Sequence, residues 1–473
     1  QFSKSLEYRK ALQMRSFDLG NWTSMGSLYW SIAYGNYKLG NYPEANMYYT
    51  LAGEYYDKGF AIYQNQGDLH EGFGSVLRKQ GKYDSSNIQY NKAVELYRFN
   101  GDKERLADAI DELAYNYFET GEYRKAIEKR NEAKEIHMQL GDFGDAGYSM
   151  SSIGQSYWNL GMLDSAIFWH KLAIENRGKG KDTFGMAFSY LKIGELYKEN
   201  GTPKDAISYY KKAAELYKQR NLKENEAEVY TKFGELYQSL ENHGFAIEEF
   251  QKALGIYEDL KYKNDIANTY ALLGFSYMRI NHYLKAKEYI DKAYYLRLEM
   301  DDKEGCMYSL CDLASLAVNQ EFDYNKAINY LDSALVIAKE TKSEYTLAYC
   351  YIFNAGIYET KGNIKLSEIF VDSAYAVYNK LEYANGQINC QLRYGWNQLN
   401  KGNFAEGLKI FNEALQVSRN KKLYAKESEC LSAIAQYQIL TSNYNSSFQY
   451  LDSSEILAVK TSNKWNIAGV ELL

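Results

Sequence analysis

Proline is almost absent from this chain of 473 residues, which contains only two. Because proline interrupts helices, its scarcity permits many long ones. No apolar run reaches the roughly 18 residues needed to span a bilayer. The 55 Lys and Arg residues against 61 Asp and Glu leave a net charge of -6, without long blocks of like charge. We therefore expect no membrane span in this segment and no nucleic-acid partner, since nucleic-acid binders usually present a basic face.

Residues that carry chemistry are few and scattered. The sequence has no CxxC pair, no HExxH motif, no glycine-rich phosphate loop and no nucleophile elbow. We therefore expect no catalytic residues, no metal site and no cofactor, so the chain is predicted not to be an enzyme. The odd number of cysteines predicts free, partly buried thiols rather than disulfides. The five cysteines are Cys306, Cys311, Cys350, Cys390 and Cys430, and the five histidines are His70, His137, His170, His243 and His282.

A small residue recurs in the middle of a helical pattern at intervals of 40 residues, with two intervals of 41. A fixed period of this length indicates a repeat protein in which each unit packs on its neighbours. The recurring residues are Ala33, Gly74, Ala114, Gly154, Gly194, Gly234, Gly274, Ala314, Ala355, Gly395 and Ala435.

Each repeat reads as two helices, which we call A and B, with a turn between them. Apolar residues follow the helical period, and Gly201 and its equivalents stand where helix A must end. His170 shares its position in helix B with Tyr210 and Phe250, so we interpret it as a packing residue. We expect the small residues to admit large rings between successive layers. The expected rings are Tyr117, Tyr157, Tyr197, Tyr237, Tyr277 and Tyr358.

These motifs, Leu-Gly-x-x-Tyr with a turn glycine and paired alanines in helix B, resemble the tetratricopeptide repeat (TPR) family. The period of 40 residues exceeds the family's usual ~34, and the proline that commonly closes helix B is missing. The resemblance implies an all-α fold: an α-solenoid, or right-handed superhelix, of about eleven helix–turn–helix units. We expect a half-repeat or cap at 1–22, the repeats at 23–460, and the start of another helix A at 461–473.

The resemblance also implies a concave groove lined by the A helices, with aromatic residues as binding anchors. The alternative is that neighbouring repeats bury these side chains. Glu195 and Glu235 occupy equivalent sites and form either an acidic patch for a basic partner or solvated carboxylates. The candidate binding residues are Trp30, Tyr34, Tyr37, Tyr115, Phe118, Tyr148, Trp158, Phe188, Glu195, Glu235, Phe275, Met278, Tyr349 and Trp396, beside Ile352, Leu392 and Leu399.

Some family members clamp a carboxyl terminus with lysine and asparagine. Trp30, Glu71 and Asp111 stand at the matching positions here, which disfavours binding of that kind.

We therefore expect a non-enzymatic scaffold that binds a protein or peptide and that can belong to a larger assembly. One alternative is the sensory domain of a bacterial signalling receptor or kinase whose effector lies outside this segment. Another is the regulatory arm of a catalytic polypeptide. Both ends fall within a repeat, so we interpret the chain as a window from a longer protein. The first residue, Gln1, favours a processed extracytoplasmic protein, whereas free cysteines favour the cytoplasm, so no compartment is predicted.

Overall fold

The computed structural model describes residues 22–59, 63–421 and 423–460, and these are helical with short turns and no strand. The all-α repeat fold expected from the sequence is thereby confirmed. None of the described helices is both long and apolar enough to cross a membrane. The half-repeats expected at 1–22 and 461–473 lie almost entirely outside the described residues, so the proposed division of the chain stays a prediction.

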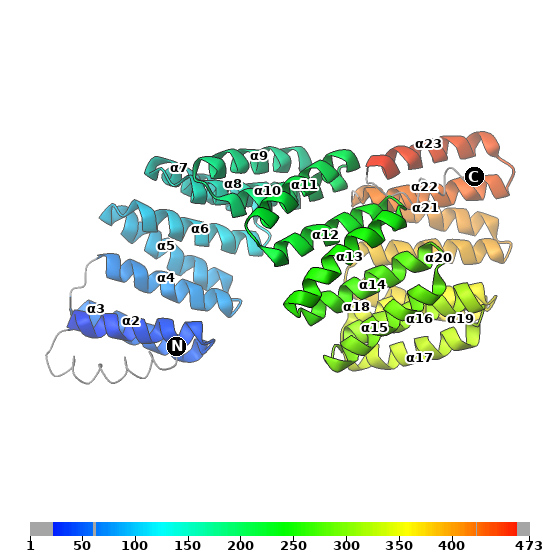
Figure 1. Cartoon of the computed structure of the whole chain (residues 1–473), viewed down its shortest axis with the longest axis horizontal. Helices are drawn as coiled ribbons and strands as arrows, with labels where there is room; N and C mark the ends of the chain where they lie inside the picture. Colours follow the sequence, from blue (N-terminus) through cyan, green and yellow to red (C-terminus); the bar gives the residue numbers. More distant parts are fainter. Residues whose placement is uncertain (1–21, 60–62, 422, 461–473) are drawn as a thin grey trace. The chain divides into compact units, whose positions relative to one another are not determined.

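Contacts divide the chain into two units, which we describe separately, with the boundary after Leu196. In the described part of the first unit, even-numbered A helices alternate with odd-numbered B helices (Figure 1). Its helices are α2 (Trp22–Lys38), α3 (Tyr42–Lys58), α4 (Tyr63–Lys79), α5 (Tyr83–Asn100), α6 (Lys103–Glu119), α7 (Tyr123–Leu140), α8 (Phe143–Asn159), α9 (Leu163–Lys179) and α10 (Thr183–Glu199), the last of which continues past the boundary.

The second unit continues the alternation, with even-numbered A helices and odd-numbered B helices. They are α11 (Pro203–Gln219), α12 (Lys223–Ser239), α13 (His243–Leu260), α14 (Lys263–Arg279), α15 (Tyr283–Glu299), α16 (Lys303–Glu321), α17 (Tyr324–Glu340), α18 (Glu344–Thr360), α19 (Ile364–Lys380), α20 (Ala384–Asn400), α21 (Phe404–Asn420), α22 (Tyr424–Leu440) and α23 (Tyr444–Lys460). In both units an A helix packs along the B helix that follows it, as α2 does on α3 and α14 on α15.

The turns between A and B helices depend on a residue in the left-handed conformation. Gly121 has φ 78°, and its amide donates to the carbonyl of Phe118 at 3.0 Å while that of Glu122 donates to Tyr117 at 2.8 Å. Glycine adopts this φ without strain and lets the chain satisfy the last helical carbonyls. The expected role of the turn glycines is confirmed at Gly201, where φ is 74°.

Each hairpin closes around one B-helix position that recurs with the repeat, which we call the layer slot. In the second unit, a Cβ built on Gly234 would lie 2.3 Å from Phe250, and one on Gly395 would lie 2.2 Å from Phe411. A small residue is therefore needed at this position of helix A, because a larger side chain would overlap the slot residue of the following B helix. The described slot residues, all buried, are Tyr49, Tyr90, Arg130, His170, Tyr210, Phe250, Ile290, Leu331, Val371, Phe411 and Leu451.

The expected packing partners of the small residues were therefore wrong. The small residues face the slot residue of their own hairpin, and not the tyrosines at the end of helix A. Several of the expected rings at the end of helix A also contact a ring of their own hairpin. Tyr277 stacks on Tyr289 with centroids 5.4 Å apart, Tyr358 on Phe370 at 5.5 Å, and Tyr237 lies 5.5 Å from Phe245.

Replacement of Gly234 by alanine tests the close approach in the layer slot. The new methyl group would overlap the Phe250 ring, so we expect Gly234→Ala to cost about 1–3 kcal/mol of unfolding free energy. Gly255 provides the matched control, because it lies in α13 and a Cβ built on it would have nothing within 4 Å. Gly255→Ala should stabilise the chain by about 0.4–1 kcal/mol through the unfolded state. Urea unfolding followed by circular dichroism measures both, and equal effects would contradict this packing.

The cysteines are free and buried, as the sequence predicts. Burial raises the pKa of Cys390 and of Cys430 to about 12. Because the thiolate is the reactive form, these thiols are inert packing residues.

Candidate functional site

The layer slot holds one arginine among otherwise aromatic, aliphatic or neutral residues. Arg130 on α7 is only 4% exposed, and its Nη1 lies 2.6 Å from Oδ1 of Asp111 on α6. Its guanidinium carbon lies 4.9 Å from the ring centre of Tyr148 on α8. The first unit therefore has a buried cation at a position that a neutral side chain fills in the other described layers.

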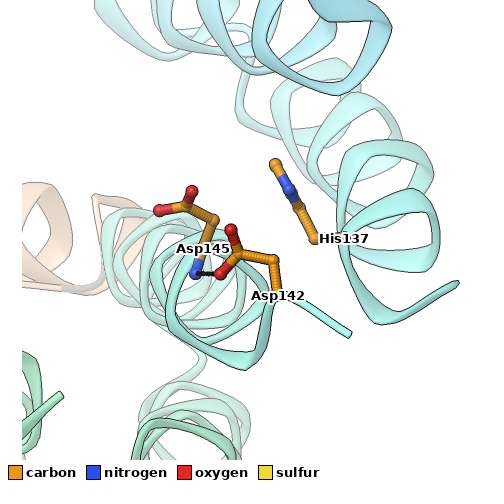
Figure 2. Close-up of side chains that lie close together, drawn as sticks. All are labelled: His137, Asp142 and Asp145. Carbon is orange, nitrogen blue, oxygen red and sulfur yellow. Dashed lines mark hydrogen bonds between the residues drawn. The ribbon is translucent and has the colours of Figure 1, made fainter. Parts of the chain in front are cut away.

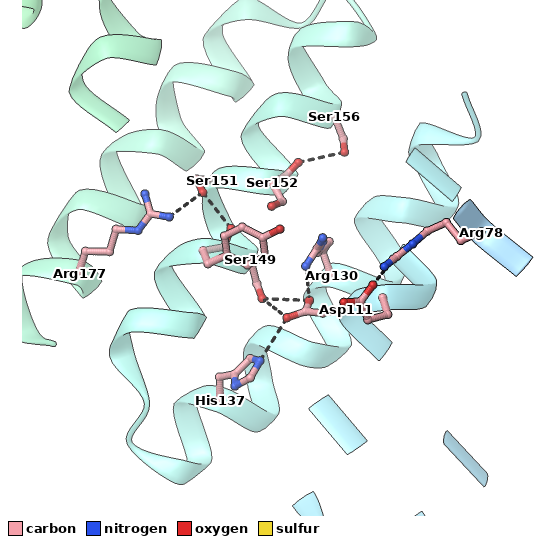
Figure 3. Close-up of polar contacts among 11 residues, drawn as sticks. Arg78, Asp111, Arg130, His137, Ser149, Ser151, Ser152, Ser156 and Arg177 are labelled. Atoms are coloured by element: carbon pink, nitrogen blue, oxygen red, sulfur yellow. Dashed lines mark hydrogen bonds and ion pairs between the residues drawn. The ribbon is translucent and has the colours of Figure 1, made fainter. Parts of the chain in front are cut away.

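Asp111 is the centre of the polar cluster around this arginine (Figure 3). The hydroxyl of Ser149 donates to both carboxylate oxygens at 3.2 Å. Nε2 of His137 lies 3.2 Å from Oδ2. Burial alone lowers the pKa of His137, but the hydrogen bond and charge of Asp111 outweigh it, and the pKa is raised.

A buried ion pair is a weak source of stability, because removing two charges from water costs several kcal/mol per ion. The aromatic slot residue of a neighbouring layer, such as Tyr90, fills the same position at no such cost. Arg130 and Asp111 are therefore better explained by a function than by folding. The raised pKa of His137 beside this pair supports the same view, because perturbed pKa values are concentrated at functional sites.

Arg177, also drawn in Figure 3, has a structural role instead. Its Nη1 donates to the Gly185 carbonyl at 2.6 Å and its Nη2 to Ser151 at 3.1 Å. In the second unit Arg297 does the same, donating to the Gly305 carbonyl at 3.1 Å. An arginine that recurs with the same backbone partner joins successive repeats.

A cavity of about 210 Å³ opens on one side of Arg130. Its rings come from three successive A helices, α6, α8 and α10, and the arginine and several hydroxyl groups lie among them. A mostly apolar cavity with a few fixed polar groups is typical of a ligand site. It is lined by Ala114, Tyr115, Phe118, Ala126, Arg130, Tyr148, Ser151, Ser152, Gln155, Ser156 and Phe188.

A second cavity of about 220 Å³ is also lined by this arginine, and it is strongly charged. Arg78 pairs there with Glu112, and its guanidinium lies 5.1 Å from the ring centre of Tyr115. The cavity is lined by Arg78, Lys79, Asp111, Glu112, Tyr115, Arg130 and Tyr148. Tyr115 and Tyr148 border both cavities, so the two form one continuous lining.

A third cavity of about 320 Å³ lies between α2, α3, α4 and α6. The indole of Trp30 is half-buried at its edge and donates to the Asp68 carbonyl at 3.1 Å. Its lining residues are Trp30, Tyr34, Tyr37, Tyr49, Asp68, Glu71, Gly72, Ser75, Arg105 and Asp108.

The structure brings together most candidate residues of the first unit. Trp30, Tyr34 and Tyr37 line the third cavity, while the rings of α6, α8 and α10 line the first. The ammonium group of Lys192 lies 5.9 Å from the ring centre of Trp158. That tryptophan is thus a neighbour of the first cavity's Phe188, over which the same ammonium lies at 5.5 Å.

The aromatic candidates of the second unit make contacts within the fold. Trp396 packs on the layer-slot residue Phe411, with ring centroids 5.2 Å apart. Tyr349 meets Tyr308 edge-on at 5.1 Å. Phe275 meets His243 edge-on at 6.0 Å. The sulfur of Met278 lies 3.8 Å from Nδ2 of Asn319.

The two acidic candidates have basic partners on their own helices. Glu195 pairs with Lys192 at 2.7 Å, and Glu235 pairs with Lys232 at 3.1 Å. Lys198 adds a second cation 3.6 Å from Glu235. These ion pairs reduce the negative charge that either residue offers to a partner.

His137, Asp142 and Asp145 lie close together at the junction of α7 and α8 (Figure 2), with one ligand-type atom from each within 4.8 Å of the others. The Asp142 carboxylate accepts a hydrogen bond from the Asp145 amide at 3.1 Å, which makes it the cap of α8. The raised pKa of His137 favours the imidazolium form, which does not bind metals. We read the group as a helix cap beside a cation.

A wider depression of about 750 Å³ crosses α13, α14 and α15 in the second unit. Its rim is formed by paired surface charges such as Lys292 and Glu288, 2.7 Å apart, and by Tyr295, which is 65% exposed. It lacks the buried polar groups that fix a ligand's orientation, so the A-helix cavities of the first unit are the better candidate.

Arg130 is the main candidate site residue that sequence reasoning missed. Its signal was present: alignment of the repeats places it in register with Tyr90, His170 and Tyr210, where it is the one charged residue. Glu71 and Asp111 were noticed only as departures from a known clamp. Their roles depend on partners from other helices, which the repeat pattern does not identify.

Models of the tetratricopeptide repeat match residues 185–259 and 267–299, and no curated protein matches the sequence. Among solved structures, the apo form of the quorum sensor NprR from B. thuringiensis is 12% identical, with a TM-score of 0.50 over 72% of this chain and 94% of that one. A signal-transduction ATPase with a tetratricopeptide-repeat sensor, from Pyrococcus horikoshii, is 19% identical, with a TM-score of 0.50 over 78% of this chain and 54% of that one. At these identities the likeness concerns the fold.

Proposed function

Because this chain is a tetratricopeptide-repeat protein, we propose that the A-helix face of its first unit binds a peptide or an extended segment of a partner protein. The observation that carries the proposal is the buried Arg130 in the layer slot, which lines both an aromatic cavity and a charged one. Such an arrangement serves a ligand better than it serves the packing of the repeats.

The aromatic and the polar residues of the lining contribute differently to binding. The rings of Tyr115, Phe118 and Phe188 supply apolar surface for side chains of the ligand. Such aromatic anchors supply most of the affinity in protein interfaces. Arg130 supplies a fixed hydrogen-bond donor, and the hydroxyls of Ser151 and Ser156, which donate to carbonyls of their own helix, supply fixed acceptors. Groups already held in place lower the entropy lost on binding.

A peptide site of this kind suits either a scaffold or the sensory domain of a signalling protein. A scaffold needs only the binding itself. A sensory domain also needs a second state of the chain that the ligand favours and that an effector recognises. We propose the binding function for this chain and keep the scaffold as its simplest use, without catalysis by these residues.

Selection from a random peptide library on the immobilised chain, followed by calorimetry with the selected peptides, tests this function. The double variant Tyr115→Ala/Phe188→Ala removes anchors contributed by α6 and α10. We expect it to weaken binding at least about thirtyfold, since the loss of one hot-spot anchor costs about 2 kcal/mol or more.

Phe168→Ala is the matched control, because this ring is 60% exposed on the B helix α9 and borders none of the three cavities. Its affinity should equal that of the wild type. Circular dichroism verifies that both variants retain their helicity. Peptides that bind the double variant and the wild type equally would place the binding surface elsewhere.

A further inference from the structure

The third cavity is lined by a group of aromatic rings from α2 and α3. The indole of Trp30 is nearly parallel to the ring of Tyr34, with centroids 5.5 Å apart, and stands edge-on to Tyr49 at 6.4 Å. Tyr37 continues the row, 6.4 Å from Tyr34. Rings from α2 and α3 thus form one wall of a cavity of about 320 Å³.

The lining of this cavity also includes carboxyl groups. Asp68 and Glu71 come from α4 and Asp108 from α6, and the lining includes only one basic residue, Arg105. That arginine pairs with Asp68, so it compensates one of the three acids. The cavity therefore combines aromatic faces with carboxyl groups that carry an excess of negative charge at a pH above the pKa of Glu71, which burial raises to about 7.

Glu71 and Asp68 are held in place by a shared donor. The hydroxyl of Tyr97 on α5 donates to Asp68 at 2.7 Å and to Glu71 at 3.0 Å. Tyr97 is itself fully buried, and a Cβ on Gly67 would come within 2.5 Å of its ring. The carboxyl groups are thus positioned before any ligand arrives.

These rings already attract a cation of the chain itself. Nζ of Lys38 lies 5.1 Å from the ring centre of Tyr34 and 5.6 Å from that of Tyr37. Both distances fall within the range of cation–π attraction, about 6 Å. A positive group thus has a favourable environment beside this wall.

We propose that this cavity binds an organic ammonium group, with its carbon atoms against the rings of Trp30, Tyr34 and Tyr49 and its charge facing Glu71 and Asp108. The proposal rests on the proposed function, because the cavity lies on the same A-helix face, and it assigns the chemistry of one part of the ligand. An anion would be repelled by the carboxyl groups. A neutral apolar group would leave them desolvated without a partner, which is costly.

Calorimetry at pH 8.5 and matched ionic strength, with three small probes, tests this inference on the whole chain, because Glu71, whose pKa is about 7, is ionised at that pH. Choline and n-butylammonium carry a quaternary and a primary ammonium, and 3,3-dimethylbutan-1-ol is the neutral analogue of choline in size and shape. We expect at least one of the cations to bind at least about tenfold more tightly than the alcohol. Equal binding by choline, butylammonium and the alcohol would overturn the proposal.

Glu71→Gln keeps the shape of the cavity and removes one charge. We expect this variant to bind the preferred ammonium at least about tenfold more weakly and the alcohol unchanged. Glu235→Gln is the control, since Glu235 is also a half-buried A-helix carboxylate but lies in the second unit with lysine partners. An unaltered ammonium affinity in a folded Glu71→Gln protein would also overturn the proposal.

The two cations distinguish the sources of the charge. Preference for choline indicates a quaternary ammonium, and preference for butylammonium indicates an amino terminus or a lysine side chain, and both results support the site. The peptide test is independent, because it depends on Tyr115 and Phe188, which do not line this cavity. If the selected peptides bind as expected and the ammonium probes do not, only the ammonium inference is wrong. If the ammonium probes bind and the peptides do not depend on Tyr115 and Phe188, only the proposed peptide site is wrong.

Discussion

Replacing Arg130 with tyrosine alone should lower the free energy of unfolding by about 3 kcal/mol, although tyrosine also fills the slot in the layers of Tyr49, Tyr90 and Tyr210. The reason is the partner left behind, since Asp111 is mostly buried, with its side chain 13% exposed. Removing one member of a buried ion pair leaves a desolvated charge, which typically costs about 3–5 kcal/mol. His137 and Ser149 still contact Asp111, so we expect the lower end of that range. Urea unfolding at neutral pH measures the loss.

The double variant Arg130→Tyr/Asp111→Ala should recover most of that stability while abolishing peptide binding. It copies layers such as the one in which Tyr210 fills the slot and removes both buried charges together. Replacing a whole buried ion pair by well-packed neutral residues is often neutral or stabilising. We expect the double variant to lie within about 1 kcal/mol of the wild type, since it creates no unpaired charge. A double variant as unstable as the single one would mean that the pair is needed for folding.

Acidic conditions should strengthen the contribution of Glu71 to stability, and alkaline conditions should weaken it. Burial raises the pKa of Glu71 to about 7 from its ordinary value of 4.5, although the Tyr97 hydroxyl bond acts in the opposite direction. The folded chain therefore binds this proton more tightly than the unfolded chain does. The favourable contribution is complete below pH ~4.5 and is lost as the pH rises through ~7, by up to about 3 kcal/mol.

Comparison of the wild type with Glu71→Gln between pH 5 and pH 8.5 isolates this effect. The groups that face Glu71 are Asp68 on its own helix, Tyr97 on α5, and Asp108 and Glu112 on α6. Burial also raises the pKa of Asp108, to about 6, but both proteins contain that group and its contribution largely cancels. The difference in unfolding free energy should shift in favour of Glu71→Gln as the pH rises. Parallel pH profiles would contradict the raised pKa.

Local features of the repeat were predictable because their causes are local. The helical period and the turn glycines depend on residues within one hairpin, and the positive φ of Gly121 and Gly201 follows directly from the need to end helix A. The identity of His170 as a packing residue was also predictable, since the repeat aligns it with Phe250. It is fully buried, and burial lowers its pKa to about 3, which keeps it neutral.

Packing partners were harder to predict. The tyrosines at the end of helix A were expected between layers. Tyr277 contacts both its own hairpin, where it stacks on Tyr289, and the preceding repeat, where its hydroxyl accepts a hydrogen bond from Gln251. A ring of this size can reach both, and its stacking partner depends on which residue of helix B lies nearest. The sequence pattern places both partners on the correct helices without deciding between them.

The sequence by itself determined that this protein is an array of paired helices, because hydrophobic periodicity and glycine conformation act over a few residues. It also determined which faces carry aromatic side chains. Only the tertiary structure decided which of these face a cavity and which charges they meet there. Trp30 lines the same cavity as Glu71, and Tyr148 lies over Arg130, because burial and electrostatic pairing depend on side chains contributed by several helices at once.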